Sequence, residues 1–395
     1  MNKSLNVWYF YVFQILRNAV FFLPVIVLFW QDNGLSMTQI MLLQSLYAFT
    51  IVILEIPTGY FADIVGRKHS LVLASCFYLV GMLIYSVGEG FFIFLAAELM
   101  LAFTSALISG SDVALLFDTL RESNSEEQFK RIWGHSLFLG ILGIAVANVL
   151  GGFIGAVNMR WTFFAAVPFA IGMLIIAALI REPRRHKLVI QKGYISELLH
   201  VVRSSLITNR RLRWLIIYAG IVYAFNQAAL WLYQPYFQIS GVDIFYFGLI
   251  FASFQIFAAV TAKYAYQLER LLGKRYSLWS LILLTGTSYL LMSNFIFLFS
   301  FSFAFLHQFV RGFSKVVIAD YVNQLSSSDS RATALSVKNQ VGQVFYALLL
   351  PMVGYIVDAY SLVDALLSLG IVSLGVGIVV LVPVLLHRRH TSTAA

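Results

Sequence analysis

The chain has 395 residues, of which 60% are hydrophobic and only 11% carry a charged side chain, and its formal net charge is +9. A soluble domain holds roughly a quarter charged residues, so most of the surface of this chain cannot face water. Repeated apolar stretches of about 20 residues, the length that a membrane-spanning helix needs, predict an all-α integral membrane protein. The single cysteine, Cys76, excludes an intramolecular disulfide and fits a small buried apolar residue.

Hydropathy predicts twelve transmembrane helices. The first covers residues 7–29; it contains Arg17 and lacks a small-residue cleavage site, so it is interpreted as an uncleaved span rather than a signal peptide. The other eleven follow at residues 37–62, 70–88, 91–120, 132–156, 160–180, 212–238, 242–268, 275–293, 296–325, 333–358 and 362–386.

Basic residues concentrate in the loops that follow the even-numbered spans. Arg67 and Lys68 lie in the first of these loops, and the loop from about 181 to 211 holds many more, whereas the loops on the opposite side contain only Arg160. Because Lys and Arg are enriched in cytoplasmic loops, we expect a multi-pass protein of the cytoplasmic (inner) membrane with both termini in the cytoplasm. The positive charge then reflects topology, and nucleic-acid binding is not expected.

The long loop divides the predicted spans into two sets of six. We expect an N-terminal six-helix bundle at residues 1–185, a cytoplasmic linker with an amphipathic surface helix at 186–211, and a C-terminal six-helix bundle at 212–395. The segment "GRKHSL" at 66–71 recurs as "GKRYSL" at 273–278, between the second and third span of each half. This repeat indicates two parallel pseudo-repeat bundles related by an axis along the membrane normal.

The residues Gly59, Asp63, Gly66, Arg67 and Lys68 form the motif of "EIPTGYFADIVGRK". This motif resembles the signature loop of the major facilitator superfamily (MFS), which joins spans two and three on the cytoplasmic side, and its wording is similar to the bacterial drug-efflux-type branches. The resemblance implies the MFS fold and a gating latch between the two halves. On physical grounds Gly66 permits a tight reversal, Gly59 allows a neighbouring helix to approach, and Asp63 is expected to pair with Arg67 or to face a helix N-terminus. A charge cluster that only sets topology is the alternative.

Two departures from the family pattern bear on export by proton exchange. Ala147 and Asn148 stand where antiporters of the superfamily usually have a Gly-Pro pair before a double glycine in span five. Span four carries Glu98 in place of the arginine that is typical of proton-coupled drug exporters. The resemblance alone therefore leaves the coupling open.

Two carboxylates in span four, Glu98 and Asp112, are the candidates for proton coupling. Burial in a low-dielectric cavity favours the neutral form of a carboxyl group, as a proton carrier needs. On one continuous helix the two residues would lie within about 40° of the same face and about 21 Å apart along the axis.

The resemblance implies that spans one, four, seven and ten line the central cavity. Besides the two carboxylates of span four, polar residues gather on spans one, seven and ten. Span ten carries His307, Arg311 and Lys315 at four-residue spacing, which predicts one cationic stripe. The predicted substrate-binding residues are Arg17, Gln14, Tyr223, Gln227, Trp231, His307 and Arg311. The alternative is that the arginines form structural ion pairs, with Glu98 or Asp112 as partners of Arg17.

The predicted function is secondary active transport of a small organic solute by alternating access, with the proton as coupling ion and export as the direction. The alternatives are an organic-anion uniporter or symporter, a lipid translocase, or a non-transporting membrane sensor. We expect no enzymatic activity, no cofactor and no metal site, since hydrolase, metalloprotease and nucleotide-binding patterns are absent from the sequence. The expected partners are the solute, the proton and membrane lipid, and we expect a monomer.

Overall fold

The computed structural model describes residues 3–183, 209–327 and 330–386, and within these ranges it consists of helices, turns and loops without a β-strand. Most of the predicted linker at 186–211, including its amphipathic segment, lies outside the described residues. The described residues divide into two compact units. Unit 1 contains residues 3–35, 46–183 and 243–255, and unit 2 contains residues 36–45, 209–242, 256–327 and 330–386.

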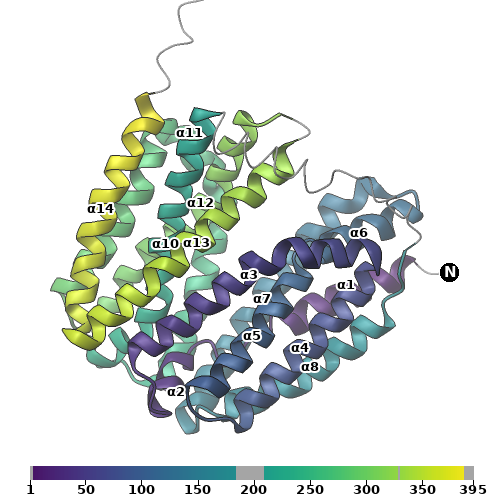
Figure 1. The fold of residues 1–395 in the computed structure, drawn as a ribbon, viewed down its shortest axis with the longest axis horizontal. Coiled ribbons are helices and arrows are strands. Elements are labelled where there is room, and N and C mark those ends of the chain that lie inside the picture. The colour runs from purple at the N-terminus through teal and green to yellow at the C-terminus, as the bar shows by residue number, and fades with distance from the viewer. Residues whose placement is uncertain (1–2, 184–208, 328–329, 387–395) are drawn as a thin grey trace, which may run out of the picture. The chain divides into compact units, whose positions relative to one another are not determined.

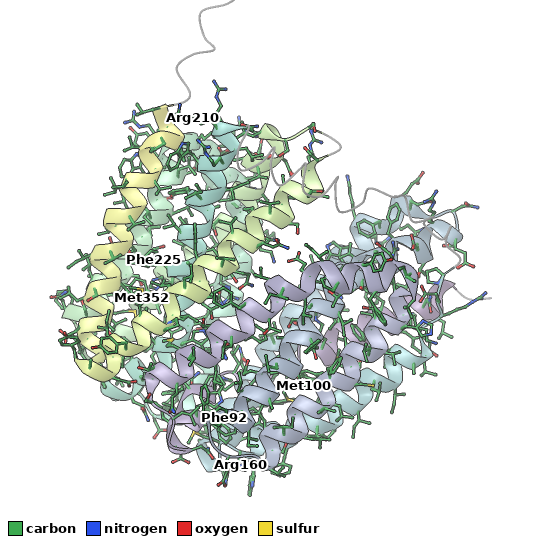
Figure 2. The ribbon with its side chains drawn as sticks, in the orientation of Figure 1. Phe92, Met100, Arg160, Arg210, Phe225 and Met352 are labelled. Atoms are coloured by element: carbon green, nitrogen blue, oxygen red, sulfur yellow. The ribbon has the colours of Figure 1, made fainter. Side chains whose placement is uncertain are left out.

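The elements of unit 1 are α1 (Lys3–Arg17), α2 (Ile26–Asp32), most of α3 (Met37–Ile64), α4 (Arg67–Val87), α5 (Phe91–Ile108), α6 (Ser111–Glu122), η1 (Glu126–Gln128), α7 (Phe129–Val157), α8 (Trp161–Leu179) and the start of α11 (Ile244–Asn294). α1 packs against α7 and α8, and α4 packs against α5 and α8 (Figure 1). Arg160, labelled in Figure 2, immediately precedes α8. Its side chain donates to the carbonyl of Gly88 at 2.8 Å and to Asn33 at 2.9 Å, and it thereby joins the start of α8 to the ends of α4 and α2.

The elements of unit 2 are the first turns of α3, α10 (Arg210–Ile239), most of α11, η3 (Ser300–Phe303), α12 (Ala304–Leu325), α13 (Arg331–Ala359) and α14 (Leu362–Leu386). α10 is the central helix, because it packs against α12, α13 and α14. Its first turn is capped by Asn209, whose side chain accepts from Leu212 N. Figure 2 labels Arg210 at the start of this helix and Phe225 halfway along it, where the chain is buried.

Nine helices in the described ranges are long and apolar enough to cross a membrane, compared with twelve predicted spans. Three predicted spans account for the difference: 242–268 and 275–293 both fall within α11, 7–29 is broken into two short helices, and α12, which covers 296–325, is not among the nine, whereas Phe91–Glu122 counts as one candidate despite its break. The predicted spans 242–268 and 275–293 are joined in α11, whose 51 residues include the non-helical Gly273 (φ 70°). The non-helical residue marks a kink between two helices, and it lies between the two predicted spans, so the predicted division into two helices agrees with the backbone.

Two predicted spans are interrupted, so the expectation of one continuous helix in each is wrong. In the span predicted at 7–29, α1 ends at Arg17 and α2 begins at Ile26. The connecting segment packs closely on α7, where a Cβ added to Gly151 would stand 1.8 Å from the carbonyl oxygen of Phe21. In the span predicted at 91–120, the chain breaks after Ile108 at Gly110, which has a left-handed φ of 75°. Irregular backbone at membrane depth is tolerated where it is buried in protein or lines a cavity.

The first turn of α3 is bound to α13 within unit 2. The Asp358 carboxylate accepts from the backbone N–H of Met37 at 3.0 Å and from that of Thr38 at 2.7 Å. One helical turn before Asp358, a Cβ at Gly354 would lie only 2.7 Å from the Met37 carbonyl oxygen. Further along the pair, the Ser45 hydroxyl donates to the Ala347 carbonyl at 2.7 Å. A charged cap and a close backbone approach thus hold residues 36–45 on α13.

Candidate functional site

The two helix interruptions of unit 1 bring a charged cluster together. Arg17 is the last residue of α1, and Asp112 lies in the first turn of α6. The Arg17 guanidinium donates to Asp112 Oδ2 at 2.9 Å, and Gln14 donates to the same oxygen at 3.1 Å. Each charge lies at the helix end whose dipole favours it, the cation at a C-terminus and the anion at an N-terminus. Only 7% of the Asp112 side chain is exposed, compared with 34% for Arg17, so the guanidinium is the accessible part of the pair.

Glu98 on α5 occupies a different environment in the same unit. It is 3% exposed, and its carboxylate accepts from the Tyr85 hydroxyl of α4. Tyr47 of α3 bonds to the Ser105 hydroxyl of α5 at 2.8 Å. Phenol hydroxyls thus bond to the buried carboxyl and to a serine of the same helix.

The break at Gly110 corrects the predicted geometry of Glu98 and Asp112. The prediction placed both carboxylates on one face of one helix, but α5 ends at Ile108 and Asp112 belongs to α6. The angular argument therefore does not apply, because a left-handed residue at Gly110 redirects the chain. Asp112 instead meets α1 through Gln14 and Arg17, as in the alternative in which Arg17 is neutralised by an acid.

An aromatic and amide group lies on α10 and α13 of unit 2. Trp231 donates its indole N–H to the Tyr346 hydroxyl. Tyr223 is stacked edge-on against Tyr346 at 6.1 Å between ring centroids, and its side chain is 38% exposed. Gln227, one turn after Tyr223, is partly buried. Tyr346, which sequence reasoning did not single out, links the predicted residues Tyr223 and Trp231 to one another.

Arg311 lies on α12, beside the same part of α10. It donates to Gln308 at 3.3 Å, and Gln308 donates to the Tyr233 hydroxyl at 3.2 Å. His307 is fully buried: its Nδ1 is 2.8 Å from the Ser288 hydroxyl, and its ring lies edge-on to Tyr289 at 4.4 Å. His307 is therefore not an accessible member of the predicted stripe. The accessible members are Arg311, which is partly buried, and Lys315, which is exposed.

The loop between α3 and α4 is held by two acids that the sequence motif does not contain. The Arg67 guanidinium forms an ion pair with Asp118 and donates to the Ala114 carbonyl at 2.7 Å. The Glu182 carboxylate accepts from Arg67 N at 3.0 Å and Lys68 N at 2.7 Å, and so caps the N-terminus of α4. The predicted pairing of Arg67 with Asp63 is thus corrected to Asp118, and Glu182 takes the position at the helix N-terminus.

The two glycines of the motif differ in their surroundings. Gly66 has a φ of 138°, and a Cβ there would meet His69 at 2.8 Å and Glu182 at 3.2 Å, so the turn requires glycine. A Cβ at Gly59 would meet no described atom within 4 Å, and the predicted close approach of a helix at Gly59 stays a prediction. In the second copy of the motif, Lys274 stacks on Tyr321 at 4.3 Å and Tyr321 donates to Glu269 at 2.6 Å.

No group of three or more His, Cys, Asp or Glu side chains in the described part of the chain is arranged to hold a metal ion. The residues that sequence reasoning missed are Tyr47, Tyr85, Glu182, Tyr346 and Asp358. Each makes its contact with a different element of the fold, and for all but Tyr85 the partner lies 58 or more residues away in the chain, so no local spacing could have identified it.

Comparison with known proteins adds a family and a fold. The family model described as Major Facilitator Superfamily matches residues 8–348. The quinolone resistance protein NorA of Staphylococcus aureus (strain MRSA252) is 24% identical over 186 residues, and the match spans 47% of this chain and 47% of NorA, about half the length of each. The uncharacterized MFS-type transporter YxaM of Bacillus subtilis (strain 168) is 22% identical over 96% of this chain and 94% of its own length. Among solved structures, that of the nucleoside transporter NupG superposes with a TM-score of 0.80 at 12% identity and covers 97% of this chain and 99% of NupG.

Proposed function

The chain belongs to the major facilitator superfamily, and from that premise we propose that it is a proton-coupled secondary transporter that exports a small organic solute by alternating access. The observation that carries the proposal is the partly buried Arg17–Asp112 pair at two helix interruptions. Broken helices whose ends face charged groups are characteristic of ion and substrate sites in secondary transporters.

The proposed architecture has twelve passes in two parallel six-helix bundles, at 1–185 and 212–395, with the linker 186–211 between them. α1 with α2 would form one pass, α5 with α6 another, and α11 two passes on either side of Gly273. The predicted loop charges then place both termini in the cytoplasm. The similar backbone of Gly66 and Gly273, both at positive φ, supports the two-copy arrangement.

The coupling proton is proposed to bind a carboxylate of unit 1. In the structure Asp112 is paired with Arg17, so protonation of Asp112 would release the guanidinium. Glu98 contacts a phenol and is almost fully buried, an environment that suits a neutral carboxyl group. Proton uptake at either group changes the net charge around Arg17, and a partly exposed arginine is suited to sense an anionic part of the solute.

Export is the proposed direction because the relative NorA is named for quinolone resistance. A transporter that confers drug resistance acts by removing the drug from the cell. The partly exposed Tyr223 with Gln227 and Arg311 would supply aromatic and polar contacts to the solute.

The test is transport in proteoliposomes with an imposed pH gradient. Quinolones, lipophilic cations and organic anions are each offered from the side that corresponds to the cytoplasm. The proposal expects accumulation of at least one class that collapses when a protonophore removes the gradient. Variants Glu98→Gln and Asp112→Asn test the carboxylates, and Glu126→Gln, an exposed acid of η1, is the matched control. Transport that is indifferent to the pH gradient would refute proton coupling.

A further inference from the structure

Three cations of unit 2 lie on neighbouring helices that the proposed twelve-pass architecture places in the membrane. Arg311 and Lys315 are four residues apart on α12, so they share a face and are about 6 Å apart along the axis. Lys338 lies on α13, which packs against α12. A charge inside the membrane costs free energy unless it faces protein, water or a ligand, which makes the position of these three groups informative.

The contacts with α10 place both lysines at the same level of the unit. α12 runs antiparallel to α10, since Asn209 bonds to the carbonyl of Leu325 and Asn226 to that of His307. Lys315, eight residues after His307, therefore lies opposite about residue 218 of α10. α13 runs parallel to α10, since a Cβ at Gly342 would meet Tyr223 at 3.0 Å and Tyr346, further along α13, bonds to Trp231, further along α10.

Lys338 precedes Gly342 by one turn and projects from the same face of α13. It consequently lies opposite about residue 219 of α10, level with Lys315. Lys338 is partly buried and Lys315 is exposed, so the pair is open on one side.

The acids of these helices are not positioned to neutralise the lysine pair. The sequence of α10 contains no Asp or Glu. Asp320 follows Lys315 by five residues, about 140° around the helix, and it bonds to Gln324 at 2.7 Å. Asp358 lies at the other end of α13 and caps α3. Two ammonium groups held at one level repel each other, and a bound anion would relieve that repulsion.

We propose that Lys315 and Lys338, together with Arg311 one turn away, form a site for a phosphate-type dianion carried by an organic molecule. A dianion matches the two positive charges of the lysine pair, which a monocarboxylate does not. Lysines bind phosphate as point charges, and an arginine fork adds directed hydrogen bonds. The exposed ring of Tyr223, beside the level of Arg311, offers a surface to the apolar or aromatic body of the ligand.

This inference deepens the proposed function, on which it rests for the idea that the ligand is cargo. The phosphate can belong to a soluble phosphate monoester or to a phosphatidic acid headgroup, and the test separates these two sources. It is a binding measurement without a pH gradient. If the protein binds phosphate but shows no gradient-driven transport, only the transport proposal fails. If it shows gradient-driven transport but does not bind phosphate, only the phosphate-site proposal fails.

The experiment measures equilibrium binding of phenyl phosphate and benzoate to the full chain in phosphatidylcholine nanodiscs. Phenyl phosphate is expected to bind more tightly than benzoate. Lys315→Gln and Lys338→Gln should each weaken phenyl phosphate roughly tenfold, the effect of about one charged hydrogen bond. Lys263→Gln, an exposed lysine of α11, is the matched control and should bind like the parent. Lys338→Arg should keep most of the affinity and serves if Lys338→Gln does not fold.

A second arm adds phosphatidic acid to the nanodiscs. Displacement of phenyl phosphate by the lipid identifies the headgroup as a ligand, and binding that is unaffected by the lipid identifies a soluble phosphate ester. Either result supports the site. A parent protein that binds neither compound, or a folded lysine variant that binds phenyl phosphate like the parent, overturns the proposal.

Discussion

The cap at the start of α3 allows a quantitative prediction. The first N–H groups of a helix have no partner within the helix. Here Met37 N and Thr38 N donate to Asp358, and Gln39 N donates to the Ser36 hydroxyl at 3.3 Å. Ser36 N in turn donates to the Gln39 side chain at 3.0 Å, which completes a capping box. Asp358 thus contributes the part of the cap that comes from another helix.

Replacement of Asp358 by Ala removes both acceptors and the negative charge at the helix N-terminus. Loss of a capping acceptor costs about 0.5–2 kcal/mol, and Asp358 is exposed to solvent, which places the cost in the lower half of that range. We therefore expect about 1 kcal/mol, equivalent to about a fivefold increase in opening of this turn.

Hydrogen exchange measures that opening directly. In Asp358→Ala the amides of Met37 and Thr38 should exchange about fivefold faster than in the parent, whereas those of α14 should not change. Asp364→Asn is the matched control, since Asp364 makes a local cap with Ser361 at the start of α14. Unchanged exchange at Met37 and Thr38 in Asp358→Ala would refute the assignment of the cap.

Two further predictions concern packing and the loop before α4. Gly151→Ala should lower the melting temperature and the folded yield, because its methyl group would stand 1.8 Å from Phe21 O. Overpacking of this kind lowers the free energy of unfolding by about 1–3 kcal/mol. Gly134→Ala on the same helix has nothing within 4 Å and should be neutral or slightly stabilising; equal melting of the two variants would contradict this reasoning. Asp118→Asn should weaken the interaction with Arg67 and lower the free energy of unfolding by about 1–3 kcal/mol. A melting curve identical to that of the parent would exclude a structural role for this ion pair.

Local features of the sequence predicted the membrane-spanning class, the positions of most helices and the turn at Gly66. The interruptions at 18–25 and at Gly110 were not predictable in the same way. Each break contains residues that favour turns, Pro24 in the first and Ser109 to Ser111 in the second, but each lies within a longer hydrophobic stretch whose hydropathy predicts a continuous span. The left-handed φ of Gly110 and the close contact of Phe21 with Gly151 depend on packing between helices.

Partners of charged residues were predictable only as sets of alternatives. Sequence reasoning named Glu98 and Asp112 as possible partners of Arg17, and the structure selects Asp112. It offered Asp63 either as a partner of Arg67 or as an acid that faces a helix N-terminus, but the guanidinium meets Asp118, which lies 51 residues further along the chain. Hydropathy and spacing describe one helix at a time, and the choice of partner is made by the tertiary fold.

The central claim is that a carboxylate of unit 1 couples a proton to solute movement, and one measurement tests it most directly. Asp112→Asn is reconstituted in proteoliposomes, and both accumulation driven by a pH gradient and exchange of solute for solute are recorded. The solute is the compound that the transport screen identifies. Asn keeps the size of the side chain and removes the proton site, so the account predicts that accumulation is lost while exchange continues. Accumulation equal to that of the parent in both Asp112→Asn and Glu98→Gln would contradict the account.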